Sequence, residues 1–292
     1  MLSFAPSFFN RRYKMKYLNT ACYHFFEVRE YLERLRKIFK RKATELNLLG
    51  TIIITPEGIN CFISGLEDDV EVFKVFLEHV CEKKLTFKDS WSTHKPFNRM
   101  LVKVKKQIVP TNDPDIDPNQ SEGMHLHPRD FEKWIDQNKD MIILDTRNEF
   151  EYQIGSFKNA THLQIENFRE FDEKLNSVPE EWKEKPIVMF CTGGIRCEKA
   201  SPIMKKKGFK EVYQLDGGIL NYFEQVGGKH YQGDCFVFDK RVALNSKLEE
   251  TDTVECFACR HPVTPEEQKL DSYKYEAYCP YCYNSPEKRT KY

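Results

Sequence analysis

One loop of the chain combines residue types that could carry out covalent chemistry: Cys191-Thr192-Gly193-Gly194-Ile195-Arg196-Cys197. It follows a short apolar run and precedes a helical pattern, which is where parallel α/β sheets collect ligands and reactive groups. The two glycines let successive N–H groups point inward, and the following helix adds the positive end of its dipole. We therefore expect Cys191 to have a depressed pKa and to exist largely as a thiolate, with Arg196 adding positive charge. The alternative is a buried cysteine that only packs as a small apolar residue.

The spacing within this loop distinguishes a cysteine phosphatase from a protein that uses a sulfur-carrying or redox cysteine. A cysteine phosphatase needs an arginine six places after its nucleophile to close around the phosphoryl group, and Cys197 stands there instead. The loop therefore favours a sulfur-carrying or redox cysteine over a phosphatase. Cys197 could resolve a persulfide or sulfenic acid formed on Cys191, or it could be a packing residue.

A second group of cysteines lies near the C-terminus, where two Cys-x-x-Cys pairs are separated by 19 residues. Each pair presents two thiolates from one tight turn, and the spacing suits a tetrahedral zinc site. A small polar segment with little apolar core also needs such a cross-link. We expect a structural zinc ion here, with disulfides or reduced thiols as the alternatives. The four ligands would be Cys256, Cys259, Cys279 and Cys282.

The elements that position the loop can be read from hydrophobic periodicity. Strand patterns alternate with two amphipathic helices, over residues 29–48 and 67–81, and end with a strand over residues 99–109. The order strand-helix-strand-strand-helix-strand is that of a ferredoxin-like or acylphosphatase-like α+β domain over residues 15–110.

The next segment, residues 111–124, is rich in Pro, Asp, Asn and Ser and is predicted to be a linker. Its alternating acidic residues resemble a calcium loop, but Pro118 and Met124 stand where that loop needs Gly and Glu. From residue 125 to 228, buried-type strands alternate with helices, which predicts a parallel α/β domain. Residues 229–292 form a small cysteine-rich segment, so the fold class as a whole is α/β.

The composition fits a globular chain with a heavily charged surface, since 40% of the residues are hydrophobic and 31% are charged. The longest largely apolar stretches last about seven residues, whereas a membrane span needs about 20, so we expect no membrane span. Ten cysteines without a secretory signal indicate a reducing compartment, and we infer the cytoplasm. Met15 is a candidate start, in which case residues 1–14 are an N-terminal extension.

Two further stretches resemble rhodanese domains. LDTRNEFEYQIGSFKNATHL, residues 144–163, resembles their strand-loop signature, and VYQLDGGI, residues 212–219, resembles their closing strand and turn. The resemblance implies that Asp145 and Arg147 organise the loops beneath the active cysteine, and that Glu151 caps or braces the adjoining segment. The alternative is an ordinary surface ion pair of little energetic weight.

The chain from Met15 onward resembles the rhodanese-domain tRNA uridine hydroxylase family. The shared pieces are YLNTACYHF near the start, EGIN followed by SG, CTGGIRCEKAS in the loop, and the cysteine-rich end. Cys61 departs from the pattern, because a glycine is expected after Asn60. The resemblance implies an oxidoreductase that uses O2 to convert uridine to 5-hydroxyuridine at the wobble position of tRNA, with Cys191 as a persulfide-forming active cysteine.

The resemblance also implies the partners: the anticodon loop of tRNA as substrate and O2 as co-substrate. No motif identifies the electron donor, and His125 and His127 are expected to be strand-edge or linker residues rather than metal ligands. The residues are also compatible with a plain sulfurtransferase acting on thiosulfate or a persulfide, and with a non-catalytic RNA-binding module.

The net charge of zero hides two oppositely charged parts. Residues 1–110 hold 20 Lys and Arg against 12 Asp and Glu, and the rest of the chain holds 25 against 33. A basic domain suits a polyanionic partner, although solvated helix surfaces also produce charge runs. We predict that basic residues of this domain follow the RNA backbone while a loop base is flipped toward Cys191. They are Arg34, Arg36, Lys37, Lys40, Arg41, Lys103, Lys105 and Lys106.

Overall fold

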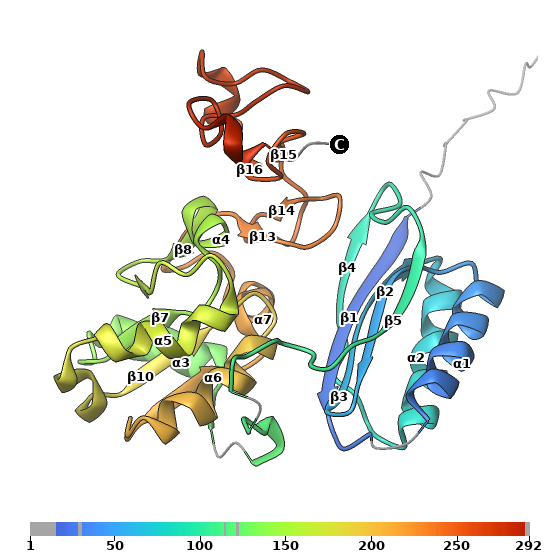
Figure 1. Cartoon of the computed structure of the whole chain (residues 1–292), viewed down its shortest axis with the longest axis horizontal. Helices are drawn as coiled ribbons and strands as arrows, with labels where there is room; N and C mark the ends of the chain where they lie inside the picture. The colour runs from blue at the N-terminus through green and yellow to red at the C-terminus, as the bar shows by residue number, and fades with distance from the viewer. Residues whose placement is uncertain (1–15, 29–30, 114, 121–122, 290–292) are drawn as a thin grey trace, which may run out of the picture.

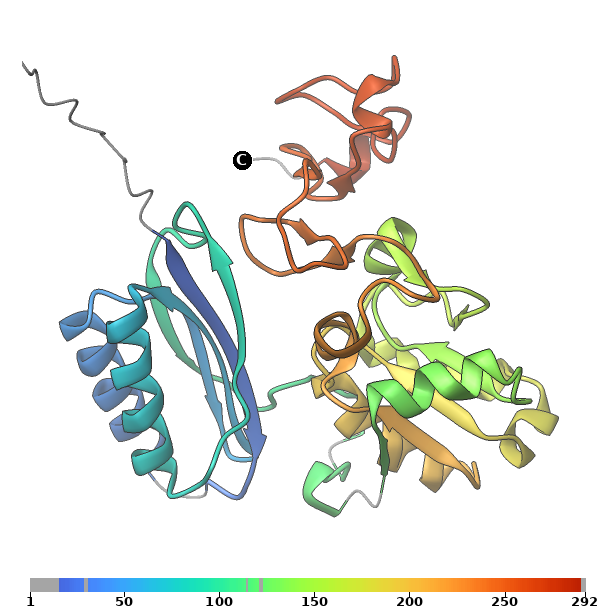
Figure 2. The same ribbon diagram turned by 180° about the vertical axis from the view of Figure 1, so that it is seen from behind.

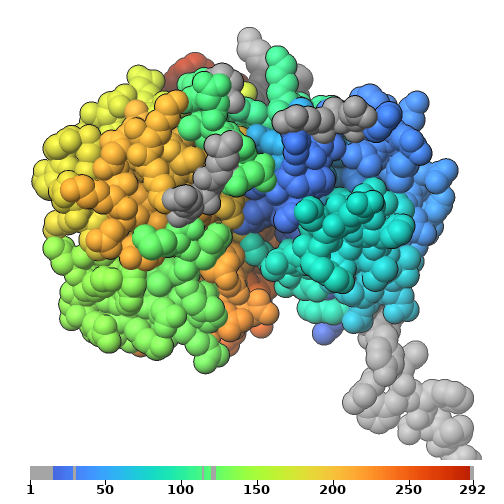
Figure 3. Space-filling view, turned by 90° about the horizontal axis from the view of Figure 1, so that it is seen from below, coloured from blue at the N-terminus to red at the C-terminus, as the bar shows by residue number. Residues whose placement is uncertain are grey.

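The computed structural model describes residues 16–28, 31–113, 115–120 and 123–289. Two α/β units lie side by side, and a small cysteine-rich segment lies at one end of the pair (Figure 1). The space-filling view from the opposite end shows the two units in contact (Figure 3).

The N-terminal unit is a five-stranded sheet with two helices. The strands are ordered β4-β1-β3-β2-β5, and both helices cover the face of the sheet that points away from the second unit (Figure 1). Its apolar core lies between that face and the helices. The other face of the sheet is therefore turned toward the second unit. The elements are β1 (Tyr17–Phe25), α1 (Leu32–Glu45), β2 (Leu49–Thr55), β3 (Gly58–Gly65), α2 (Glu67–Cys81), β4 (Lys88–Ser92) and β5 (Met100–Val104).

The last strand of the predicted strand-helix order differs between the sequence prediction and the structure. The fourth strand is β4, which pairs antiparallel with β1, whereas the predicted final strand over residues 99–109 is the shorter β5. β5 pairs parallel with β2 and is an addition at the opposite edge. The sequence of β4, KDSWS, has no apolar alternation because an edge strand has fewer side chains to bury.

The predicted linker is packed rather than loose. Ile116 of the linker is buried in the core of the second unit, as are Ile108 and Val109, which precede the linker. The Ile116 carbonyl also accepts a hydrogen bond of 3.2 Å from the buried Lys199 ammonium. These contacts fix the second unit relative to the first.

The second unit contains a sheet of order β6-β11-β10-β7-β9 in which every neighbouring pair is parallel. α3 and α7 pack on one face, and α5 and α6 pack on the other. The predicted helix near residues 166–175 is a series of short turns around a four-residue α5. His125 lies on the edge strand β6, and His127 is the N-cap residue of α3. The elements are β6 (Met124–Leu126), α3 (Pro128–Asp136), β7 (Ile142–Asp145), α4 (Glu149–Ile154), β8 (Gly155–Phe157), β9 (Thr161–His162), α5 (Phe171–Lys174), β10 (Ile187–Phe190), α6 (Ile195–Lys206), β11 (Val212–Leu215) and α7 (Gly218–Val226).

The C-terminal segment is built from two-residue and three-residue strands. The first of them pairs with β8, and the rest form two small hairpins. Figure 2 shows the chain running from α7 past β13 and β14 into the cysteine-rich end. None of the helices in the described part of the chain is long and apolar enough to cross a bilayer. The strands are β12 (Tyr231–Gly233), β13 (Cys235–Phe236), β14 (Ala243–Leu244), β15 (Val254–Glu255) and β16 (Pro262–Val263).

Candidate active site

The cysteine loop lies where β10 ends and α6 begins. Cys191 directly follows β10, and the N–H of Gly194 donates a hydrogen bond of 3.1 Å to the Cys191 sulfur. Gly194 has a φ of 96°, a left-handed conformation that glycine adopts without strain. α6 begins at Ile195, so Arg196 and Cys197 lie in its first turn.

Cys191 is buried among groups that favour its thiolate form. Burial alone would raise its pKa, but the Cys197 thiol, the Arg196 charge and the N–H groups of Arg196 and Gly194 together lower the pKa to about 5. Burial and the neighbouring Cys191 raise the pKa of Cys197, so Cys197 keeps its proton. Cys197 therefore acts as a hydrogen-bond donor to the thiolate. Its role in turnover stays a prediction.

Glu151 holds Arg196 beside the thiolate. The guanidinium donates to both carboxylate oxygens at 2.6 and 2.7 Å, and the Glu151 side chain is fully buried. The same carboxylate accepts from the N–H of Asn148 and so completes the capping box of α4. The Thr192 hydroxyl donates to it at 3.3 Å. One carboxylate thus links α4, the loop and the first turn of α6.

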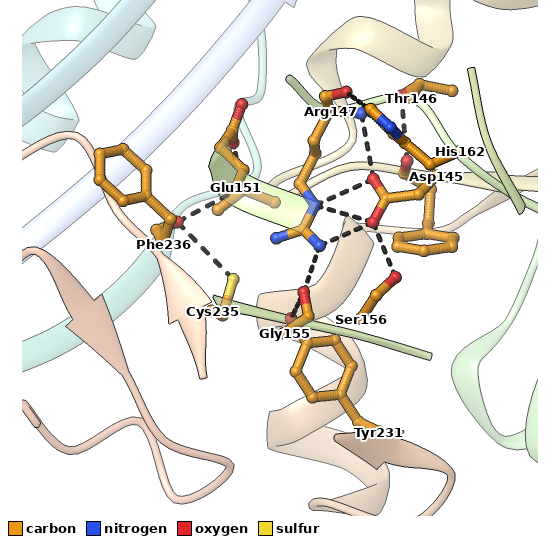
Figure 4. A network of polar contacts seen from close by, with 12 residues as sticks. Asp145, Thr146, Arg147, Glu151, Gly155, Ser156, His162, Tyr231, Cys235 and Phe236 are labelled. Carbon is orange, nitrogen blue, oxygen red and sulfur yellow. Dashed lines mark hydrogen bonds and ion pairs between the residues drawn. The ribbon is translucent and has the colours of Figure 1, made fainter. Parts of the chain in front are cut away.

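Asp145 and Arg147 form a second buried ion pair (Figure 4). The Arg147 guanidinium donates to Asp145 at 2.7 Å and to the Gly155 carbonyl at 2.6 Å. The Ser156 hydroxyl also donates to Asp145, and the Tyr231 hydroxyl donates to the Gly155 carbonyl, both at 2.8 Å. Neither charged side chain is exposed, so the alternative of an ordinary surface ion pair is wrong.

Side chains of the N-terminal sheet reach the loop. The Lys88 ammonium donates to the Gly193 carbonyl, and the Tyr23 hydroxyl donates to Glu198 at 3.2 Å. Burial lowers the pKa of Lys88, while burial and the Glu198 charge raise the pKa of Tyr23. The loop is therefore covered by the other domain.

A cavity of about 410 Å³ lies between the sheet, the loop, α7 and the β13–β14 hairpin. Its volume is within the range of about 300–1,000 Å³ that is typical of ligand pockets. The cavity is largely apolar, and Cys191 contributes to its wall. The aromatic side chains that line it are Tyr23, Phe62, Phe97 and Phe238.

Both units of the fold match known domain families. The UPF0176 acylphosphatase like domain matches residues 17–108, and the Rhodanese-like domain matches residues 127–225. A protein of Burkholderia cenocepacia named tRNA uridine(34) hydroxylase is 44% identical over 278 residues, which cover 92% of this chain and 98% of that protein. A protein of the same name from Cupriavidus metallidurans is 43% identical over 274 residues, covering 92% and 97%. The chain belongs to the tRNA uridine(34) hydroxylase family.

This assignment confirms the family and the fold class predicted from the sequence. The matched regions of tRNA uridine(34) hydroxylases extend over both units, so the cavity between them lies within the shared part of the chain.

The basic residues predicted to contact RNA do not line this cavity. Five of them lie on α1, on the opposite face of the sheet (Figure 2). Lys40 donates to the Met100 carbonyl at 2.6 Å, and Arg36 pairs with Glu33 at 2.6 Å. Lys103, Lys105 and Lys106 lie on or just after β5, at the edge of the sheet opposite to β4. Their contact with RNA stays a prediction.

The four cysteines of the C-terminal segment converge in the structure. All four sulfurs lie within 4.8 Å of one another, and three of the residues are buried. The sulfur of Cys279 lies 3.5 Å from that of Cys259 and 3.9 Å from that of Cys282. A tetrahedral zinc ion with Zn–S bonds of about 2.3 Å needs sulfur separations of about 3.8 Å. The donor set therefore fits a metal ion.

Sequence reasoning missed the residues of the N-terminal domain that complete the site. Tyr23 lies in the stretch YLNTACYHF that carried the family resemblance, so a signal was available for it. Lys88 lies in the polar strand β4, where no periodicity marks it. Phe238 lies in the irregular C-terminal segment, and its proximity to the loop depends on the tertiary fold.

Proposed function

We propose that this protein converts uridine to 5-hydroxyuridine at the wobble position of tRNA, using O2, and that the reaction takes place in the cavity beside Cys191. The observation that carries the proposal is the position of Cys191 in the wall of a cavity shared by both domains of a tRNA uridine(34) hydroxylase family member. Its surroundings lower its pKa to about 5. The anticodon loop is the part of tRNA that would enter.

The reaction replaces the C5–H of uracil by C5–OH. One oxygen atom of O2 goes to C5 and the other leaves as water, which takes up two electrons and two protons from a reductant. Uracil is electron-poor at C6, and a thiolate that bonds to C6 shifts electron density to C5, the atom that gains oxygen. We assign this nucleophilic role to Cys191. Expulsion of the thiolate and loss of the C5 proton then restore the C5–C6 double bond.

Arg196 and the backbone N–H groups of Gly194 and Arg196 support the nucleophilic role of Cys191. They stabilise the negative charge on sulfur before attack and after release. Glu151 is a positioning residue, because it acts through Arg196.

The proposal is tested by incubating the purified protein in air with unmodified tRNA and a reductant, followed by mass spectrometry of the nucleosides. We expect a uridine product heavier by one oxygen, which is absent when O2 is removed and absent with Cys191→Ser. Absence of the product with wild-type protein that binds tRNA and holds an intact thiol would contradict the proposal. Sulfur transfer from thiosulfate to cyanide, which needs neither tRNA nor O2, would then identify a sulfurtransferase.

We further propose that the cysteine-rich segment binds one structural zinc ion through Cys256, Cys259, Cys279 and Cys282. The sulfur separations of 3.5 and 3.9 Å support it. When bound, zinc would hold β15, β16 and the last turns together in a segment whose own apolar cluster is small.

A further inference from the structure

The face of the N-terminal sheet that lines the cavity has a regular arrangement of side chains. β3 lies in the centre of the sheet, and its neighbours β1 and β2 place residues directly opposite each other across it. Alternate strand residues point to the same face, so two adjacent rows project from the side away from the helices. All members of both rows line the cavity. The rows are Tyr23-Asn60-Ile53 and Ala21-Phe62-Thr51.

Most polar side chains of the cavity are already bound within the protein. Arg196 is held by Glu151, and Arg241 is held by Asp239 at 2.6 Å. Within the part of the chain that the structure describes, the Asn60 amide has no hydrogen-bond partner. The same holds for the hydroxyl of Thr51 and for Glu224, which is exposed at the rim. The cavity residues with a partner include Tyr23, Lys88, Asp89, Ser90, Thr192 and Asn221.

The free amide of Asn60 offers one hydrogen-bond donor next to one acceptor. The edge of uracil offers the complementary pair, the O4 acceptor next to the N3–H donor. The Asn60 side chain is partly exposed, so its amide is accessible to a ligand in the cavity. The position of Asn60 therefore suits a ligand that forms both hydrogen bonds.

The neighbouring Phe62 offers a surface for stacking. Phe97 packs edge-on against its ring, with the centroids 5.1 Å apart and an angle of 81° between the planes. This contact fixes the orientation of Phe62. RNA-recognition sheets stack unpaired bases on aromatic side chains of this kind, and stacking accepts any base while hydrogen bonds select among them.

We infer that the β1–β3–β2 face binds the target base of the RNA, with Phe62 as the stacking ring and the Asn60 amide paired to the O4 and N3–H edge. Cys191 lines the same cavity, so the bound base lies beside the thiolate. The inference rests on the proposed function, which supplies a uridine as the substrate. It adds two specificity-determining residues from a domain that does not contain the reactive cysteine.

The first experiment compares two anticodon stem-loops, one with uridine at position 34 and one with an abasic site there. The ratio of their affinities isolates the contribution of the base from that of the RNA backbone. With the wild-type protein we expect uridine to bind at least about fivefold more tightly. Asn60→Leu and Phe62→Leu should each bring this ratio close to one, while the affinity for the abasic RNA stays unchanged. Phe76→Leu, the same change on helix α2, which packs on the side of the sheet away from the cavity, should keep the wild-type ratio.

A second experiment needs no variant and therefore does not depend on the folding of one. A stem-loop with 4-thiouridine at position 34 is irradiated with the wild-type protein, and the cross-linked peptides are mapped by mass spectrometry. We expect cross-links within residues 17–25 or 58–65, the strands β1 and β3. Cross-links confined to α1 or to residues 254–289 would overturn the inference.

The same stem-loop with uridine is also tested for conversion by the wild-type protein. If conversion occurs but Asn60→Leu and Phe62→Leu keep the wild-type affinity ratio, the inference is wrong and the proposed function stands. If the wild-type protein produces no 5-hydroxyuridine, the proposed function itself fails.

Discussion

The carboxylate of Glu57 lies 2.5 Å from the ammonium nitrogen of Lys199. Glu57 is in the turn between β2 and β3, and Lys199 is on α6, the helix that follows the cysteine loop. The other oxygen of Glu57 accepts the N–H of Ile108 at 2.6 Å. Lys199 is fully buried, so this pair joins the two domains at the helix that positions Arg196 and Cys197.

Glu57→Gln should lower the free energy of unfolding. The substitution leaves the Lys199 ammonium buried without its counter-ion, and breaking a buried ion pair in this way costs about 3–5 kcal/mol. Urea unfolding of the wild type and the variant measures the difference. Lys206→Gln removes an exposed ion pair of the same helix with Asp113 and should change the stability little. Equal effects of the two substitutions would show that Glu57 does not join the domains as described.

Cys197→Ala should raise the pKa of Cys191. The loss of the Cys197 hydrogen bond removes one of the interactions that hold the pKa near 5, so the midpoint moves toward the value of about 8.5 for a free cysteine. Thiolate absorbance in the ultraviolet, taken as the difference from Cys191→Ser, follows the titration. The wild-type thiolate should persist down to about pH 5 and disappear below it, whereas the variant should lose it at higher pH. Cys197→Ser keeps a hydrogen-bond donor, so its titration midpoint should lie between those of the wild type and Cys197→Ala. An unchanged midpoint in Cys197→Ala would show that Cys197 only packs in the core.

The elements and the site differ in how far the sequence predicts them. The helix predicted over residues 67–81 is α2 with the same bounds, because its apolar residues recur on one face that packs on the sheet. The cysteine loop was also predictable, because its glycines, cysteines and arginine are neighbours in the chain. The contact of Lys88 with Gly193 joins residues 105 positions apart and depends on how the two domains dock, which no local pattern encodes. The burial of Asp145 and Arg147 likewise follows from packing rather than from spacing.

Glu151→Gln should destabilise the protein while leaving α4 capped. Glutamine can still accept the Asn148 N–H, so the capping box persists, but the buried Arg196 charge loses its counter-ion. We expect a loss of about 3–5 kcal/mol in the free energy of unfolding. Glu149→Gln, on the same helix and more exposed, serves as the matched control. Product formation by Glu151→Gln should fall even where the protein is folded, since Arg196 is no longer held beside the thiolate.

Protein purified without exposure to a chelator should contain about one zinc ion per chain. Cys279→Ser removes the sulfur that lies 3.5 Å from that of Cys259 and 3.9 Å from that of Cys282, and it should lower the zinc content to near zero. Metal analysis by mass spectrometry measures the content, and proteolysis should cut residues 254–289 first in the variant. The thiolate absorbance of Cys191 should be unchanged, because the reactive loop belongs to the second unit. Zinc well below one ion per wild-type chain would contradict the zinc site.

Neutralising the basic face of α1 should separate binding of the tRNA body from binding of the target base. We expect a variant with Arg36, Lys37, Lys40 and Arg41 all changed to Gln to bind full-length tRNA more weakly. The slope of log affinity against log salt should fall by about one for each residue that contacts a phosphate. Since α1 lies on the face away from the cavity, the uridine-to-abasic affinity ratio of the stem-loop should stay at the wild-type value. Unchanged affinity and salt slope with full-length tRNA would exclude α1 as an RNA-binding surface, and a lower affinity ratio would show that α1 and the cavity are coupled.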